Sequence, residues 1–167
     1  MRACKTVLII GCLVVPAAVA QVEWRLLETA GERPDPRRGV AGLFEPESGQ
    51  LLFQGGETAT ARFRDDLWRF DPVTLRWAKV ETIGLPQRCH HTLVLDDTRQ
   101  RGLMFGGFPR TNQLLEWNVL DGQWRDVTPP VSPSARCLHS SVIDRPRERM
   151  IVYGGLNGNF LPDLSDT

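Results

Sequence analysis

The sequence has no excess of either charge and few tyrosines or cysteines. Its 167 residues include 20 Lys and Arg, 20 Asp and Glu, one Tyr and four Cys. A balanced charge supplies no general attraction to nucleic acid or to an anionic membrane surface, so we predict neither as a partner. The hydrophobic content of 41% excludes a mostly disordered chain. The length is about that of one domain.

Long hydrophobic runs are also missing, apart from one near the N-terminus. Two basic residues precede the apolar run Val7–Val15, and the small residues Ala18–Ala20 follow it. This order is typical of a secretory signal peptide, with an uncleaved anchor or a lipoprotein signal at Cys12 as alternatives. The run is shorter than the roughly 20 residues of a spanning helix. We therefore predict that residues 1–20 are removed after Ala20, that the protein is secreted or periplasmic, and that the mature chain has no transmembrane span.

Glycine and proline, in contrast, are abundant at 15 and 12 residues. Glycine pairs recur at spacings of 51 and 48 residues, and several other residue types recur in the same order. One period shared by several residue types indicates an internal repeat. The recurring residues are Gly55-Gly56, Gly106-Gly107 and Gly154-Gly155; Arg38, Arg88 and Arg136; Trp68 and Trp117; Trp77 and Trp124.

Each repeat contains four short strand-like stretches. In the first repeat they are residues 39–44, 51–54, 66–70 and 75–80, and in the second 89–95, 102–105, 113–118 and 123–127. The last two stretches of the second repeat flank Asp121-Gly122, a strong hairpin signal. The unit is therefore predicted to be a four-stranded antiparallel meander.

These motifs resemble the kelch family. In the first repeat the resemblance lies in an arginine, in the apolar strand Leu51–Gln54 with the glycine pair that follows it, in Asp65–Pro72 and in a final tryptophan. The pattern recurs in the later repeats, where His91 and His139 also match. It implies an all-β fold, a partial kelch-type β-propeller made of four-stranded antiparallel blades. We predict a propeller fragment over residues 21–167, with blades at 36–82 and 86–128 and an incomplete blade at 134–167.

The two ends of the chain do not fill whole blades. Residues 21–30 are similar to the last strand of a repeat and are predicted to be the outer strand of a closing blade. The third repeat stops before its last strand. We therefore expect a piece of a longer propeller. If the chain does end at Thr167, its unpaired strand edges favour self-association.

The recurring residues have structural roles in this interpretation. Glycine pairs permit positive φ or close backbone approach, and the tryptophans fill the space between neighbouring sheets. The arginines are expected to bridge blades through backbone carbonyls or carboxylates. Ala41 is aligned with His91 and His139, so the first repeat lacks the histidine.

Cysteine and histidine recur together as Cys89–His91 and Cys137–His139. These are ligand types for zinc, but a Cys-x-His pair lacks the spacing of structural zinc sites, so we predict no metal. The resemblance places both cysteines on innermost strands, where neighbours converge. A disulfide between Cys89 and Cys137 and a pair of buried or free thiols both stay open.

The function expected from this fold is a binding scaffold that recognises a protein or a carbohydrate through the loops at the blade ends. The alternative is part of a carbohydrate-active kelch-fold enzyme of the epimerase or oxidase type, with an active site completed by other blades. No catalytic residue and no cofactor are predicted, and the chain leans toward a non-enzyme. The candidate ligand-binding residues are Arg62, Arg64, Arg110, Asn112, Asn157 and Asn159.

Overall fold

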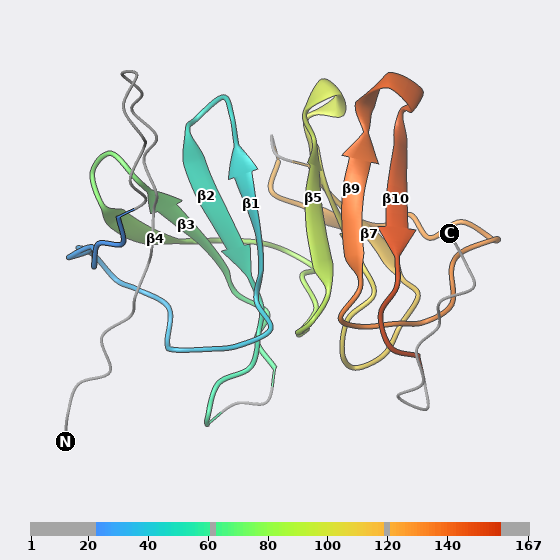
Figure 1. Ribbon diagram of the computed structural model, residues 1–167, viewed down its shortest axis with the longest axis horizontal. Coiled ribbons are helices and arrows are strands. Elements are labelled where there is room, and N and C mark those ends of the chain that lie inside the picture. Colours follow the sequence, from blue (N-terminus) through green and yellow to red (C-terminus); the bar gives the residue numbers. More distant parts are fainter. Residues whose placement is uncertain (1–22, 61–62, 119–120, 158–167) are drawn as a thin grey trace.

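The computed structural model describes residues 23–60, 63–118 and 121–157, which form three antiparallel sheets (Figure 1). Blade 1 contains β1 (Ala41–Glu45), β2 (Gln50–Gln54), β3 (Leu67–Asp71) and β4 (Arg76–Val80). Blade 2 contains β5 (Thr92–Asp96), β6 (Arg101–Phe105), β7 (Leu114–Asn118) and β8 (Trp124–Asp126). Blade 3 shows a hairpin of β9 (Ser140–Asp144) and β10 (Arg149–Tyr153), and one-turn 3-10 helices lie at Asp97–Arg99 and Arg145–Arg147.

This arrangement confirms the all-β prediction and the four-stranded antiparallel blade. In blades 1 and 2 each strand pairs with the next along the chain, as in a meander. The first strands of the blades are neighbours, because β1 lies against β5 and β5 lies against β9 (Figure 1). An open groove lined by residues 42–44, 93–95 and 141–146 runs along these three strands. The first strands are thus the innermost, as the resemblance implies.

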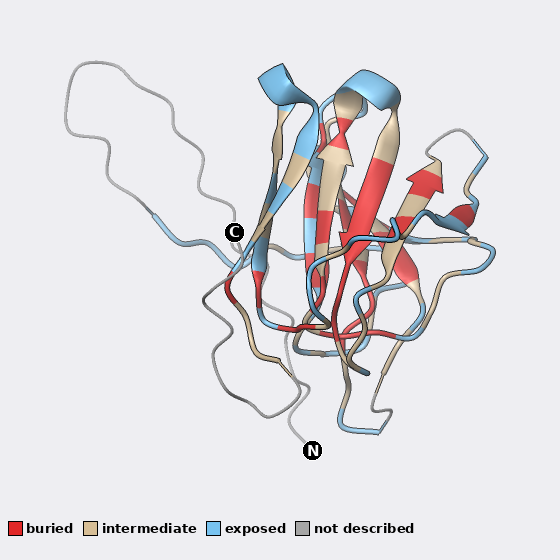
Figure 2. Cartoon of the chain, turned by 90° about the vertical axis from the view of Figure 1, so that its right-hand side faces the viewer, coloured by how far each residue is buried: buried red, intermediate tan, exposed pale blue. Residues whose placement is uncertain are grey.

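The core lies between blades 1 and 2, and a second buried cluster lies within blade 1. Alternate residues of β1 are buried and exposed, because successive side chains of a strand point to opposite faces. Leu52, Leu67, Phe70 and Met104 are completely buried. Each such side chain contributes about 1.5–3 kcal/mol by leaving water. Figure 2 shows the buried residues in the middle strands and the exposed residues at the hairpin turns.

The strand register corrects the predicted equivalence of Trp68 and Trp117. Trp117 pairs with Trp124 across β7 and β8, whereas it is Phe70 that pairs with Trp77 across β3 and β4. The connection from β2 to β3 is four residues longer than that from β6 to β7, so the repeat spacing falls from 51 to 47 across it. All four tryptophans are nevertheless buried, as predicted for packing residues.

The register also shifts the predicted repeat marks at the start of blade 1 by one residue. The inner strands begin at Ala41, Thr92 and Ser140, so the residue before each strand is Val40, His91 or His139. Val40, rather than Ala41, therefore takes the histidine position. By the same count Arg37, rather than Arg38, is equivalent to Arg88 and Arg136.

The N-terminal part of the chain is described only from residue 23 onward, so most predictions for it stay untested. Residues 23–29 form no strand, and Ala30 makes a single parallel bridge to Arg76. Residues 21–22 lie outside the described residues, as does any closing blade, so the outer strand over 21–30 stays a prediction. Residues 1–20, the predicted signal peptide, lie outside the described residues. Within the described ranges, no helix is long and apolar enough to span a membrane.

Candidate functional site

The connections from β2 to β3, from β4 to β5 and from β6 to β7 emerge at one end of the blades, with the segment that follows β10. We call this the loop end, and the opposite end, where the short turns of the hairpins lie, the hairpin end (Figure 1). In a meander, successive connections lie at opposite ends of the sheet, because successive strands run in opposite directions. The glycine pairs and the starts of the inner strands both lie at the loop end.

The glycine pairs of blades 1 and 2 each connect their blade to the next through the backbone. Gly56 N–H donates to the carbonyl of Arg88 (2.8 Å), and Gly107 N–H donates to that of Arg136 (2.8 Å). A Cβ at Gly55 would lie only 2.3 Å from the carbonyl oxygen of Arg88, and φ there is +67°. Both expectations for these glycines, positive φ and close approach, are confirmed.

The arginine side chains act differently from the prediction. Arg88 and Arg136 donate through Nη1 to Gly106 O (3.1 Å) and Gly154 O (3.0 Å), each within its own blade. Their main chains bridge to the preceding blade: both carbonyls accept a glycine N–H, and Arg88 N–H also donates to Arg64 O. The side chain of Arg88 thus fixes the glycine turn of blade 2, and Gly107 of that turn donates its N–H to blade 3.

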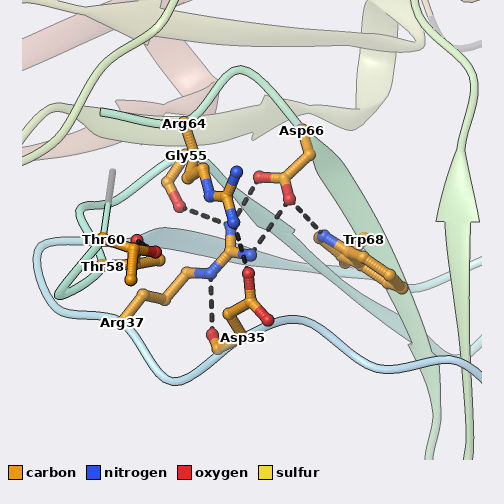
Figure 3. A network of polar contacts seen from close by, with 8 residues as sticks. All are labelled: Asp35, Arg37, Gly55, Thr58, Thr60, Arg64, Asp66 and Trp68. Carbon is orange, nitrogen blue, oxygen red and sulfur yellow. Dashed lines mark hydrogen bonds and ion pairs between the residues drawn. The ribbon is translucent and has the colours of Figure 1, made fainter. Parts of the chain in front are cut away.

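Arg37 performs this role in blade 1 and has an acidic partner as well (Figure 3). Its Nη1 donates to Gly55 O (3.0 Å), and its two terminal nitrogens lie 2.5 and 3.0 Å from the carboxylate oxygens of Asp66. Trp68 Nε1 also donates to Asp66 (2.8 Å). Burial alone would raise the pKa of Asp66, but the hydrogen bonds from Arg37 and Trp68 and the charges of Arg37 and Arg64 lower it. Arg38, the predicted repeat mark, is exposed and instead pairs with Glu57.

A second series of backbone bonds joins the inner turns of all three blades. His90 N–H donates to Gly39 O (2.7 Å), and Leu138 N–H donates to His90 O (2.9 Å). Gly39, His90 and Leu138 are equivalent residues, and all three have positive φ. The backbone conformation is thus conserved between blades although the side chains differ.

His91 and His139 pack at equivalent places between blades. His91 lies against Gly55 and His139 lies against Gly106. Burial, helped by the charge of Arg88, lowers the pKa of His91 to about 3; burial and Arg136 lower the pKa of His139 to about 4. Both imidazoles are therefore neutral near pH 7. His139 Nε2 lies 2.9 Å from Thr92 Oγ1, whereas the residue equivalent to Thr92 in blade 1 is Ala41, which has no hydroxyl.

One cluster of metal-binding residue types lies at the junction of blades 1 and 2. Donor atoms of Glu57, Cys89 and His90 all lie within 4.8 Å of one another. Glu57 Oε1 is 3.6 Å from His90 Nε2 and accepts a bond from Arg38 Nε (2.7 Å). The sequence pattern pairs Cys89 with His91 rather than with His90, because a strand through Cys89 would place alternate residues on one face. The strand begins at Thr92, and the turn before it directs His90 toward Glu57.

The disulfide considered for Cys89 and Cys137 is not formed. Both residues are buried, and neither is part of a disulfide. The stretch 89–95 was predicted to be one strand, but Cys89 lies before β5 and forms an isolated bridge with Phe108, as Cys137 does with Leu156.

The structure describes four of the six predicted ligand-binding residues, and all four lie at the loop end. Arg64 forms an ion pair with Asp35, and its carbonyl accepts the N–H of Arg88 (3.0 Å). Arg110 lies over the Phe108 ring at 5.8 Å. Asn112 is exposed and Asn157 half-buried. Arg62 and Asn159 lie outside the described residues.

The described residues bring together no constellation of the oxidase type. Tyr153, the one tyrosine, is exposed on β10, whereas Cys89 and Cys137 are buried. No observation therefore favours the enzyme alternative.

Comparison with known proteins identifies the repeat. The KLHDC2/KLHL20/DRC7 Kelch-repeats domain family matches residues 13–166. Human Host cell factor 2 is 32% identical over 111 residues, which are 62% of this chain and 14% of that protein. Dynein regulatory complex subunit 7 of Chlamydomonas reinhardtii is 30% identical over 87 residues, 52% of this chain and 8% of that protein.

The chain thus spans only a small part of these relatives, and their whole-protein roles do not transfer with the match. The match does cover the glycine pairs, the inner turns and the blade strands described above. Kelch-repeat domains are typically protein-binding scaffolds. The chain belongs to the KLHDC2/KLHL20/DRC7 Kelch-repeats domain family.

Proposed function

We propose that this chain is a secreted or periplasmic scaffold that binds a protein partner through the loop end. The observation that carries the proposal is the contrast between a fixed frame and variable loops at that end. Backbone bonds at Gly56, Gly107, His90 and Leu138 hold the loop bases, while the side chains beyond them differ from blade to blade. Rigidly held loops with varied side chains commonly carry recognition.

Two features of the loop end support a protein partner over a small ligand. The β2–β3 connection is long, and its exposed residues include Ala59, Thr60 and Asp65. A shallow hollow next to it is lined by Pro36–Arg38 and Glu57–Ala59. Loops spread over two blades present a broad surface, which suits an extended partner segment.

The test is a selection of displayed peptides on the immobilised full chain, followed by affinity measurements on variants. Thr60→Ala and Asn112→Ala change exposed loop-end residues. Thr98→Ala and Val73→Ser change exposed residues at the hairpin end and serve as controls. We expect a selected peptide to lose at least about tenfold in affinity with a loop-end variant and to bind both controls unchanged. Enrichment of no peptide, or loss of binding only in the controls, would contradict the proposal.

The location is tested separately by N-terminal sequencing of the protein recovered from outside the cytoplasm. Removal of residues 1–20 predicts a chain that starts at Gln21. A cytoplasmic protein that keeps Met1 would contradict it without bearing on the binding surface.

A further inference from the structure

We propose that Glu57, Cys89 and His90 form a zinc site that joins blade 1 to blade 2. Glu57 follows the glycine pair of blade 1, and the other two residues belong to the inner turn of blade 2. A thiolate, an imidazole and a carboxylate are the three side-chain donors that zinc uses in proteins. Soft thiolate and imidazole donors exclude magnesium and calcium as the preferred ions.

The distances between the three donor atoms suit tetrahedral coordination of zinc with little rearrangement. Zinc bonds of about 2.0–2.3 Å place neighbouring donors about 3.3–3.7 Å apart. Glu57 Oε1 and His90 Nε2 are already 3.6 Å apart, and all three donors lie within 4.8 Å. The side chains of Glu57 and His90 are 18% and 28% exposed, so rotation of these two chains toward the buried Cys89 closes the remaining distance.

The backbone around the donors is fixed from both sides. Glu57 exchanges two backbone hydrogen bonds with Arg38 (2.9 and 3.0 Å), and Cys89 does the same with Phe108 (2.7 and 3.1 Å). His90 is held by its bond to Gly39. Arg38 Nε donates to Oε1 of Glu57, and an outer partner of this kind orients a ligating carboxylate.

The next junction offers a natural comparison. Its equivalent residues are Phe108, Cys137 and Leu138, so it keeps the buried thiol and lacks the other two donors. Glu57 and His90 are therefore additions to the shared framework at one junction, and framework packing does not require them. With three protein ligands, one coordination position stays open for water or for a donor from a partner.

The experiment uses the full chain carrying Cys4→Ser and Cys12→Ser, so that Cys89 and Cys137 are the remaining thiols. The metal-free protein is titrated with Co²⁺, whose thiolate charge-transfer absorption reports cysteine ligation, and then with Zn²⁺ against a chelator. We expect one ion per chain and a rise in the unfolding temperature with zinc, because an ion bound only by the folded state stabilises it.

Three variants and one control complete the test. Glu57→Gln keeps an acceptor for Arg38, His90→Leu copies the equivalent residue of blade 3, and Cys89→Ser removes the thiolate. Each is expected to weaken zinc binding at least about tenfold, since loss of even an outer hydrogen-bond partner of a ligand lowers metal affinity by about that factor. Cys137→Ser is expected to bind like the parent. Absence of the cobalt thiolate band, full affinity in Glu57→Gln or His90→Leu, or loss of binding in Cys137→Ser would overturn the proposal.

Discussion

The two blade junctions share two backbone bonds and differ in their side chains. At both, a glycine N–H reaches an arginine carbonyl at 2.8 Å, and an inner turn donates to the turn before it. The first junction carries Glu57 and His90, where the second has Phe108 and Leu138. Main-chain geometry therefore defines the repeat, and side chains at fixed positions are free to acquire a separate role at one junction only.

The largest effect is expected from the glycines that make the close approach. A Cβ at Gly55 or Gly106 would lie 2.3 or 2.6 Å from a backbone carbonyl, whereas one at Gly154 meets nothing within 4 Å. All three have similar positive φ. Gly55→Ala and Gly106→Ala should each lower the free energy of unfolding by more than about 3 kcal/mol, since the junction must open.

Gly154→Ala is the matched control and should cost only about 1–2 kcal/mol, the penalty for positive φ. Urea unfolding of the three variants measures these differences. Equal losses in all three would show that conformation alone, and not contact between blades, requires the glycines.

A somewhat smaller effect is expected from the corrected arginine. The side chains of Arg37 and Asp66 are 7% and 14% exposed, so Arg37→Met leaves a largely buried carboxylate without its cation. Loss of one partner of such a pair costs about 3 kcal/mol. Arg38 is 81% exposed, and Arg38→Met should cost less than about 1 kcal/mol.

Chemical denaturation of the two methionine variants decides between these arginines. A larger loss for Arg38→Met than for Arg37→Met would restore Arg38 as the repeat residue. Comparable losses would mean that the bonds of Arg37 to Asp66 and Gly55 together stabilise the fold no more than the exposed pair of Arg38 with Glu57.

The smallest effect concerns the histidines of the two junctions. Their pKa values in the folded state, about 3 for His91 and about 4 for His139, lie below the ordinary 6.5. Above pH 6.5 neither state binds the proton, so stability is unaffected. As the pH falls below 6.5 the unfolded chain binds protons that the folded chain does not, and stability is lost until the folded pKa is reached.

At pH 5 each histidine should therefore cost about 2 kcal/mol relative to pH 7.5. His91→Val, which copies Val40 of blade 1, should remove about half of the loss in unfolding free energy. The loss due to His139 levels off near pH 4 and that due to His91 only near pH 3. Unchanged pH dependence in His91→Val would show that His91 is not buried in its neutral form.

Much of the fold follows from residues that recur. The glycine pairs and apolar strand stretches predict the meander and most strand bounds to within one or two residues, because period-two burial and positive φ are local demands. The predicted equivalence of Trp68 and Trp117, in contrast, was wrong. A single residue type gives no register, and the longer β2–β3 connection changes the spacing between Phe70 and Trp117.

The candidate sites were less predictable. Arg64, chosen as a ligand-binding loop residue, pairs with Asp35 and takes part in the junction. The Glu57, Cys89 and His90 cluster was missed because its members come from two blades and from a turn taken for a strand. A signal was present in Glu57, which replaces an apolar residue at the position of Phe108 and Leu156.

The sequence by itself determined that this chain is built from kelch-type repeats of about 50 residues, because turns, strand alternation and large aromatic residues are encoded locally. Only the tertiary structure decided which arginine, histidine and tryptophan are equivalent, since these depend on hydrogen-bond register between strands. It also decided that Glu57 faces Cys89 and His90, because donors 32 and 33 residues apart in the chain meet only when one blade packs on the next.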